Sequence, residues 1–307
     1  MCLVTNKYID PFTDFGFKHI FGTEENKFIL ISFLNDLLDI EHKIVDIKYR
    51  NLEKLGLNLL DRKAIFDIYC TDEKGNNFIV ELQRSKQKYF KDRSIYYTTF
   101  PIQEQSQRGD WDYRLKKVYF IGILEFTIDD SKEYLRKIQL LDTKTKEVFY
   151  DKLTYYYIEI PKFKKSDKEL SNHLEYWMWY LSNLSKINHI PPKLKEYEPI
   201  KKAFDVAEFL ALDRDKQFAY QLDLKARLDY KNVMDYAKEV AKKEGREQGL
   251  KEGIKEGIKE GIEKGKEKGK KEEKIKIATN LLKANMNIEF IAQTTGLSVE
   301  EIKKIKV

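Results

Sequence analysis

Two acidic side chains interrupt a stretch that otherwise has the pattern of a β-hairpin, residues 64–85 (AIFDIYCTDEKGNNFIVELQRS). Apolar and polar residues alternate along both arms, which is typical of strands with one face on a core. The turn suits a three-residue loop with Gly75 in the left-handed conformation, and this loop pairs residue 67 with residue 81. Asp67, Glu81 and Gln83 are therefore expected on one face of the hairpin, opposite the apolar stripe.

Asp67 and Glu81 are candidate metal ligands. Two carboxylates on one face repel each other unless a positive charge lies between them, and a divalent metal ion would supply that charge. The alternative is that both acids are ordinary solvent-side residues of the strands, with Asp67 opposite Arg62 or Lys63.

The composition narrows the chemistry that is open to the chain. With 307 residues, 42% hydrophobic and 35% charged, it is long enough for one large domain or two smaller ones. The four histidines are scattered, the two cysteines lie far apart and no glycine-rich nucleotide loop is present, so zinc and nucleotide-cofactor chemistry are not expected. Without a run of about 20 apolar residues or an export signal, we expect no membrane partner and a cytoplasmic location. Any catalysis must then depend on carboxylates and a metal.

The segments around the hairpin predict a mixed α/β fold. An apolar stripe predicts a helix over residues 25–39, and alternation predicts a strand over 43–50. A helix is expected from residue 86, with an interruption at Pro101, before a continuous apolar strand at 118–126 that should be buried on both faces. Further strands are expected at residues 136–141, 147–150 and 154–160. This order predicts a mixed sheet with a crossover helix.

A short N-terminal helix carries a second pair of charged residues. Thr13 could cap this helix, and Asp14 and Lys18 lie one helical turn apart. The two side chains could reach a common site, or they could form a local ion pair on the surface.

Basic and aromatic residues interleave in the segment directly after the hairpin. Lysine and arginine supply the counterion-release part of the affinity for a phosphate backbone, and the net charge of +6 has the sign expected of a nucleic-acid-binding protein. The alternative is a solvated helix face whose aromatic residues cover the sheet. The candidate DNA-binding residues are Lys86, Lys88, Lys91, Arg93 and Tyr97.

A glycine repeat marks the C-terminal half, which is otherwise expected to be helical. Seven glycines recur at every fourth position from Gly245 to Gly269, and apolar residues follow four of them, from Leu250 to Ile262. Each glycine costs a helix about 1 kcal/mol relative to alanine. The alternatives are therefore a frayed, charged helical linker or a helix that is ordered only in an oligomer.

The last residues have the pattern of a helix, a Gly-containing turn and a capped second helix. Ser298 and Glu301 form a capping box at the start of the last helix. This order is typical of a helix-turn-helix module. Because Glu300 and Glu301 lie near the start of the last helix, a dimerisation or regulatory module is an alternative to a reader of DNA sequence.

Several long motifs carry a resemblance to a known family: YIDPFTDFGFKHIFG (8–22), DRKAIFDI (61–68), FIVELQ (78–83), residues 86–105, the glycine repeat and GLSVEEI near the C-terminus. They resemble the Rpn family, also described as PD-(D/E)XK nuclease family transposases. The resemblance implies an α/β, restriction-endonuclease-like mixed-sheet core with an α-helical C-terminal region, metal-dependent DNA cleavage, and a role in recombination or mobile elements. The expected domains are a PD-(D/E)XK-like nuclease domain at 1–165, a helical region at 166–238, the charged Gly-every-four repeat at 239–273 and a small helix-turn-helix-like module at 274–307.

The family's motif carries over as Asp67 and as Glu81-Leu82-Gln83, with Gln83 in place of the motif lysine. It implies Mg²⁺, or alternatively Mn²⁺ or Ca²⁺, bound by Asp67 and Glu81. Gln83 can orient a water but cannot titrate, so the base must be the metal-activated water or a nearby lysine such as Lys86. The rival expectation is a catalytically degenerate DNA-binding or oligomeric assembly protein; a three-carboxylate transposase is a third, for which no further acid stands out. The expected partners are DNA and, through the C-terminal helical region, further copies of the chain.

Overall fold

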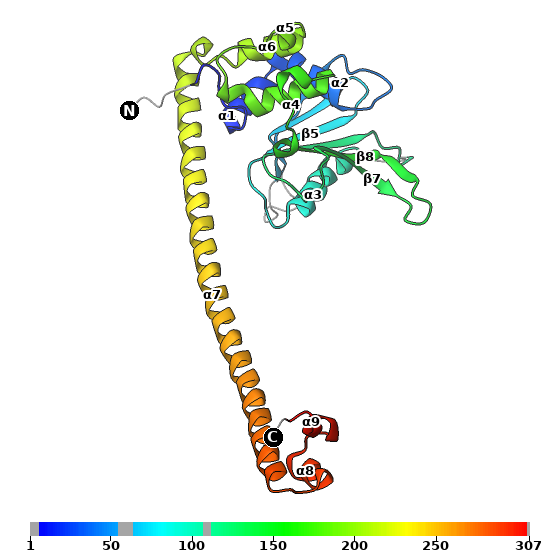
Figure 1. Ribbon diagram of the computed structural model, residues 1–307. Helices are drawn as coiled ribbons and strands as arrows, with labels where there is room; N and C mark the ends of the chain where they lie inside the picture. Colours follow the sequence, from blue (N-terminus) through cyan, green and yellow to red (C-terminus); the bar gives the residue numbers. More distant parts are fainter. Residues whose placement is uncertain (1–5, 55–63, 107–111, 306–307) are drawn as a thin grey trace. The chain divides into compact units, whose positions relative to one another are not determined.

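The structure is a computed structural model and describes residues 6–54, 64–106 and 112–305. The chain divides into two compact units, Met1–Asp229 and Tyr230–Val307. In the first unit, helices lie on both faces of a mixed sheet (Figure 1).

Six strands form this sheet in the spatial order β1-β4-β5-β6-β8-β7. They are β1 (Ile47–Tyr49), β4 (Ile68–Asp72), β5 (Asn77–Gln83), β6 (Val118–Leu124), β8 (Val148–Glu159) and β7 (Leu135–Leu141). β4 is antiparallel to β1 and β5, whereas β5, β6 and β8 run parallel, and β7 is antiparallel to β8. Helix α3 (Phe90–Gln103) makes the crossover from β5 to β6 that parallel neighbours require. The predicted mixed sheet with a crossover helix is confirmed.

The hairpin of β4 and β5 has the predicted register. Thr71 pairs with Asn77, and Gly75 in the turn has a φ of +79°, a conformation that glycine adopts without steric cost. The first arm is shorter than predicted. It begins at Ile68, because the chain leaves the ladder at residues 66 and 67.

The prediction that this hairpin has one face on a core and one face in solvent is wrong, because both faces are buried. Every residue of β5 is buried. On one face, Cys70 and Val80 belong to a core that also includes residues of α1 (Asp14–Phe21), α2 (Lys27–Leu37), α4 (His173–Asn183) and α6 (Glu198–Val206). On the other face, Tyr69 and Ile79 pack with residues of α3.

Phe66 lies on the opposite side of the sheet from the one that strict alternation predicts. Its ring centroid is 5.1 Å from that of Tyr97 and 6.1 Å from that of Phe100, both on α3. The preceding residues form the short strand β3 (Ala64–Ile65), which pairs with β2 (Glu53–Lys54) rather than with β5. The turn of the chain between β3 and β4 therefore moves Phe66 out of the face that carries Cys70.

Two side-chain hydrogen bonds attach α3 to the sheet. Ser94 Oγ lies 2.6 Å from the hydroxyl of Tyr157, and Thr98 Oγ1 lies 2.8 Å from the hydroxyl of Tyr155. α3 begins at Phe90 instead of residue 86, and it continues through Pro101 to Gln103. Pro101 lies in the last turn of the helix, which ends two residues later, so the predicted interruption is wrong.

Two strands predicted at 147–150 and 154–160 are one strand, β8. Its pairing with β7 continues across an irregularity between Ile138 and Leu140, so the chain needs no turn there. Strand β6 is buried along its whole length, as predicted from its continuous apolar run. The helices after β8 complete the first core: Trp177 of α4 packs against Phe21, and Tyr180 packs against Phe204 of α6.

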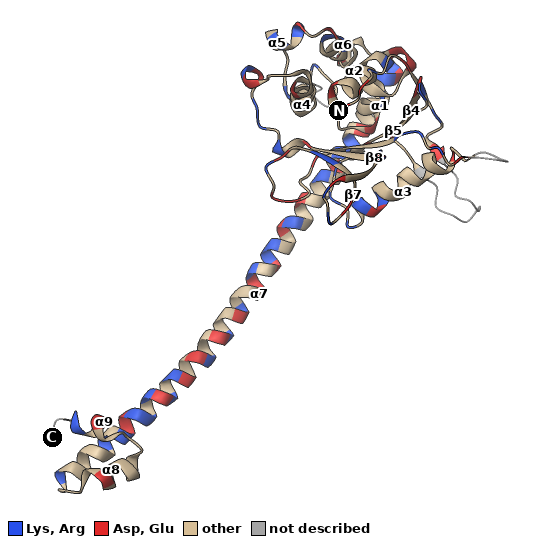
Figure 2. Ribbon diagram, turned by 90° about the vertical axis from the view of Figure 1, so that its right-hand side faces the viewer, with Lys and Arg blue, Asp and Glu red and all other residues tan. Residues whose placement is uncertain are grey.

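Helix α7 (Arg214–Lys283) is continuous through all seven glycines of the repeat, so the repeat is helical, as both alternatives for it require. Its residues 214–229 belong to the first unit and the remainder to the second. Lysine, arginine and acidic residues alternate along its exposed length (Figure 2). None of the helices in the described part of the chain is long and apolar enough to cross a membrane.

The end of α7 packs with α8 (Ile288–Thr295) and α9 (Val299–Lys303) around a small core of Ala278, Ile291, Leu297 and Ile302. Between α8 and α9, Gly296 has a φ of +67°. The predicted capping box is confirmed, because Ser298 Oγ accepts from the backbone N–H of Glu301 and the Glu301 carboxylate accepts from the backbone N–H of Ser298. The short helix α5 (Pro192–Lys195) precedes α6 in the first unit.

Candidate active site

Asp67 and Glu81 lie together at the end of the hairpin, in the pairing that the register predicts. The backbone N–H of Asp67 donates to Glu81 Oε1 at 3.0 Å, and Asp67 Oδ2 accepts from the backbone N–H of Leu82 at 2.7 Å. The first of these bonds is available because residue 67 has left the β-ladder and its N–H needs another acceptor. The two reciprocal bonds fix both carboxylates against the opposite strand.

Gln83 lies beside the pair, on the same strand as Glu81. Its Nε2 lies 3.4 Å from Glu81 Oε2. The alternative interpretation as solvent-side residues does not hold for Glu81 and Gln83, which are 3% and 6% exposed, whereas Asp67 is half-buried. Arg62 and Lys63, which that alternative placed opposite Asp67, lie outside the described residues.

Burial makes the ionised form of this pair unfavourable. Burial raises the pKa of Glu81 well above its usual range, and the neighbouring charge of Asp67 raises the pKa further. The pKa of Asp67 is also raised, first by burial and then by the charge of Asp14. Positive charges lower the two pKa values in part: Lys18 acts on both carboxyls, Arg84 on Asp67 and Arg93 on Glu81. Without a cation, the pair is therefore expected to retain a proton above the usual carboxyl range.

The pair on the N-terminal helix combines both predicted alternatives. Lys18 Nζ lies 2.9 Å from Asp14 Oδ1, which is the local ion pair. The charges of both residues also act on the pKa of Asp67: Asp14 raises it and Lys18 lowers it. The helix is positioned by its predicted cap, because Thr13 Oγ1 accepts from the backbone N–H of Gly16 at 2.9 Å.

The basic segment after β5 divides into two parts. Lys86, Lys88 and Lys91 are exposed. Lys86 Nζ donates to the backbone carbonyl of Ile128 at 3.1 Å, and Lys88 Nζ lies 5.3 Å from the ring centroid of Tyr89. None of these contacts of Lys86 and Lys88 is made with the acid pair.

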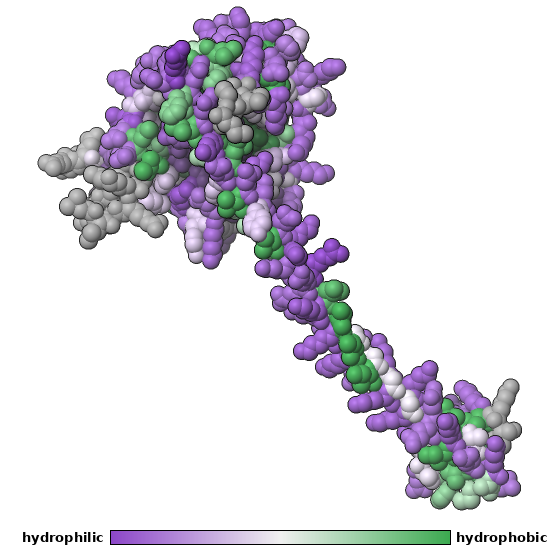
Figure 3. Space-filling model, turned by 90° about the vertical axis from the view of Figure 1, so that its left-hand side faces the viewer, coloured by the Kyte–Doolittle hydropathy of each residue, from purple (hydrophilic) through white to green (hydrophobic). Residues whose placement is uncertain are grey.

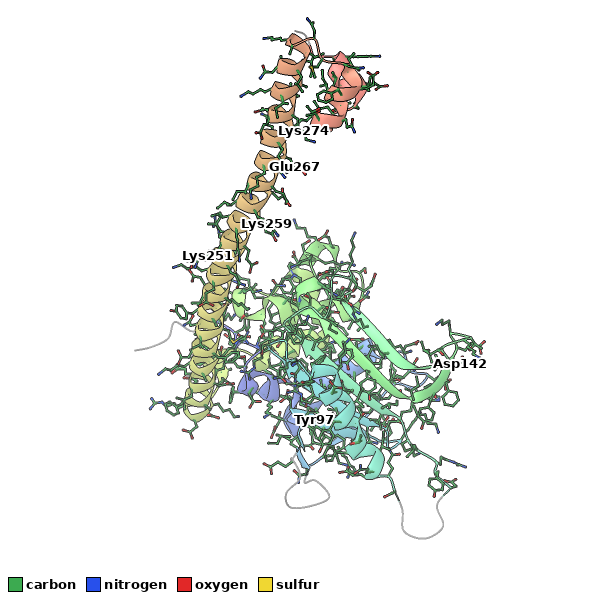
Figure 4. All side chains as sticks on the ribbon, turned by 90° about the horizontal axis from the view of Figure 1, so that it is seen from below. Tyr97, Asp142, Lys251, Lys259, Glu267 and Lys274 are labelled. Carbon is green, nitrogen blue, oxygen red and sulfur yellow. The ribbon has the colours of Figure 1, made fainter. Side chains whose placement is uncertain are left out.

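Arg93 and Tyr97 form the part that interacts electrostatically with the carboxylates. The guanidinium of Arg93 lies 5.6 Å from the ring centroid of Tyr97 and donates to Gln87 Oε1 at 2.8 Å. The pKa of Tyr97 is raised by burial and then by the charges of Glu81 and Asp67. In Figure 4, Tyr97 projects from α3. Of the five predicted DNA-binding residues, these two interact electrostatically with Glu81.

Residue Arg227 of α7 lies at the same end of strands β5 and β6, which no pattern in the sequence predicts. Arg227 binds the Glu125 carboxylate through both Nη atoms, at 2.7 and 2.6 Å, and its Nε donates to Asp10 Oδ2 at 3.0 Å. The backbone N–H of Glu125 in turn donates to the carbonyl of Gln83 at 2.9 Å. Arg227 and Glu125 are 102 residues apart in the chain, and no local pattern signals their contact.

The donor atoms suit a hard divalent cation. Carboxylate and amide oxygens are the ligand type of Mg²⁺, which commonly takes one or two protein carboxylates and keeps several waters. Within the described ranges, no three or more His, Cys, Asp or Glu side chains converge as a possible metal cluster. The donor set that remains is Asp67, Glu81 and the amide of Gln83.

Two family models match the chain. One, described as PD-(D/E)XK nuclease family transposase, matches residues 11–237. The other, described as Rpn/YhgA-like nuclease family, C-terminal HTH domain, matches residues 271–307. No curated protein and no solved structure gives a significant match. The first match contains the whole acid site, and the second contains the helix-turn-helix pattern.

Proposed function

The chain belongs to the PD-(D/E)XK nuclease family transposases, and from this membership we propose that it is a Mg²⁺-dependent DNA endonuclease that acts in recombination or in mobile elements. The observation that carries the proposal is the pair of the half-buried Asp67 and the buried Glu81, joined by a backbone hydrogen bond of 3.0 Å. Two carboxylates withdrawn from solvent cost stability unless a cation is held there, so function is the better explanation of their presence.

In this proposal Asp67 and Glu81 hold the cation. When bound, a divalent ion supplies Lewis-acid activation of water and offsets the charge that develops on the scissile phosphate. Gln83 orients the attacking water, because its amide can donate and accept hydrogen bonds but cannot titrate. Arg93 contacts the phosphate next to the cleaved bond, since its positive charge already acts on Glu81.

Lys18 is a better candidate than Lys86 for the role of the absent motif lysine. Both amines have a partner, Asp14 for Lys18 and the carbonyl of Ile128 for Lys86, but it is the charge of Lys18 that acts on both carboxyls. Lys88 and Lys91 remain candidates for contacts with the DNA backbone farther from the cleaved bond, because both are exposed.

The proposed partners are DNA, bound by the nuclease unit and by the C-terminal module, and a second copy of the chain through the C-terminal helical region. The match of residues 271–307 to an HTH domain supports DNA binding by the module.

The test is nicking of supercoiled plasmid by the purified full chain with Mg²⁺. Asp67→Ala and Glu81→Ala should each abolish nicking, whereas Asp235→Ala, an exposed acid on α7, should leave it unchanged. Circular dichroism checks that the variants are folded. Equal nicking by wild type and Asp67→Ala would overturn the proposal.

A second function, a catalytically degenerate DNA-binding protein, is favoured by one observation, the glutamine at position 83 in place of a titratable lysine. It predicts DNA binding that needs no metal and is unaffected by Glu81→Ala, with no cleavage under Mg²⁺, Mn²⁺ or Ca²⁺. An electrophoretic mobility shift with EDTA, run beside the nicking assay, separates the two functions.

A further inference from the structure

An exposed apolar stripe runs along the part of α7 that lies in the second unit. Leu250, Ile254, Ile258 and Ile262 are 54–65% exposed, and Figure 3 shows a hydrophobic band along this helix. In an isolated helix such a stripe and its neighbouring glycines are both unfavourable. A binding partner that covers the stripe would remove this cost, and the charged residues beside the stripe indicate which partner it is.

The repeat has four parallel ridges over residues 249–262, because glycine, an apolar residue, lysine and glutamate recur in that order. The glycine ridge adjoins the apolar ridge. The glutamate ridge (Glu252, Glu256, Glu260) flanks the glycine side, and the lysine ridge (Lys251, Lys255, Lys259) flanks the apolar side. Figure 4 labels Lys251 and Lys259 on this helix. The two sides of the apolar seam thus carry opposite charge.

We infer that this seam binds a second copy of the chain as a parallel two-fold helix pair. A two-fold axis parallel to the helices places each apolar ridge against the partner's glycine ridge and each glutamate ridge against the partner's lysine ridge. An antiparallel pair over the same residues places lysine against lysine and glutamate against glutamate. Charge complementarity therefore selects the parallel arrangement.

The glycines allow the close approach that this pairing needs. Apart from the adjacent residues and the backbone of the same helical turns, no heavy atom of the described residues lies within 4 Å of the position that a Cβ would occupy at Gly253, Gly257 or Gly261. A ridge with a four-residue period drifts about 40° per repeat, which favours the right-handed crossing of helix pairs packed through small residues. An isoleucine of one copy can then rest on the bare backbone of the other.

Beyond Ile262 the charges change places but remain complementary. Glu263 and Glu267 continue the lysine ridge, and Lys264 and Lys268 continue the glutamate ridge. In the parallel pair each still faces an opposite charge of the partner. Because both chains run in one direction, the two modules of residues 274–307 lie at the same end of the seam, as two helix-turn-helix modules on paired DNA half-sites require.

The inference rests on the self-association proposed above, and it is tested on the full chain by sedimentation over a concentration series. Gly257→Ala should weaken the dimer about tenfold or more, because a methyl group enters the closest contact of the seam. Gly245→Ala lies before the first apolar residue and before the four ridges begin, so it is the matched control, with an unchanged dissociation constant. In a solitary helix both alanines would raise helicity alike.

Orientation is tested by charge reversal and by cross-linking. Reversal of the three lysines to glutamate should dissociate the dimer, and added reversal of the three glutamates to lysine should restore it. In a Cys2→Ser background, Leu250→Cys alone should form a disulfide-linked dimer under mild oxidation. A monomer at all concentrations would overturn self-association itself. A dimer that Gly257→Ala does not weaken, or that Leu250→Cys does not cross-link, would overturn the parallel seam alone, and neither result depends on nuclease activity.

Discussion

Replacing Glu81 with glutamine should make the metal-free protein more stable and remove its response to Mg²⁺. The side chain keeps its size and still offers an oxygen to the backbone N–H of Asp67. An uncompensated charge in the interior typically costs about 3–5 kcal/mol. Here the backbone N–H, the Gln83 amide and the positive charges of Lys18 and Arg93 offset part of that cost. We therefore expect Glu81→Gln to raise the free energy of unfolding by about 1–3 kcal/mol at pH 8 in EDTA.

The sign of the pH dependence follows from the direction of the pKa shift. A carboxyl whose pKa is raised on folding keeps, in the folded state, a proton that the unfolded state has already released. Its contribution to stability is complete below the ordinary pKa of about 4.5 and is lost as the pH rises through the higher pKa of the folded state. The stability difference between Glu81→Gln and wild type should therefore grow between pH 5 and pH 9.

Urea denaturation followed by tryptophan fluorescence measures this difference, because Trp177 and Trp179 are buried in the first unit. In EDTA the midpoint of Glu81→Gln should exceed that of wild type, and more so at higher pH. At a Mg²⁺ concentration 100 times the dissociation constant, wild type should gain about 2.7 kcal/mol while the variant gains none. Equal midpoints in EDTA at every pH would refute the reasoning that the acid pair is held at a cost.

Three further substitutions test the surroundings of the site. Arg227→Ala should lower the free energy of unfolding of the first unit by about 2–3 kcal/mol, because Glu125 loses its bidentate partner in a half-buried position. The control is Arg246→Ala, on the exposed part of α7. Equal shifts of the urea midpoint in the two variants would contradict the expectation. Gly75→Ala should lower the free energy of unfolding by about 1–2 kcal/mol, because alanine is strained at a φ of +79°. A clash does not contribute, since the nearest atom to the new Cβ is 3.7 Å away. An unchanged melting temperature would show that the turn relaxes. Gln83→Lys should raise the rate of plasmid nicking, because it returns a titratable amine to the motif position; a slower rate would show that the site depends on the amide itself.

The hairpin and its acid pair could be predicted from the sequence because they depend on neighbours across one short turn. Alternation and the position of Gly75 determined which residues oppose each other, and Asp67 and Glu81 meet as that register requires. The same rule misplaced Phe66, since a single turn of the chain between β3 and β4 moves the ring to the other face. Alternation reports the pattern along a strand but not the point at which the strand ends.

The sequence by itself determined the order of strands and helices that makes a mixed sheet, the register of the hairpin, the candidate carboxylates and the ridges of the glycine repeat. Each of these depends on patterns among residues a few positions apart. Only the tertiary structure decided that Glu81 and Gln83 are buried, since that depends on α3 lying over a strand face that was expected to face solvent. It also brought the charge of Lys18 close enough to act on both carboxyls, and it joined Arg227 to Glu125. These interactions link residues tens to more than a hundred positions apart, and such separations leave no periodic pattern in a single sequence.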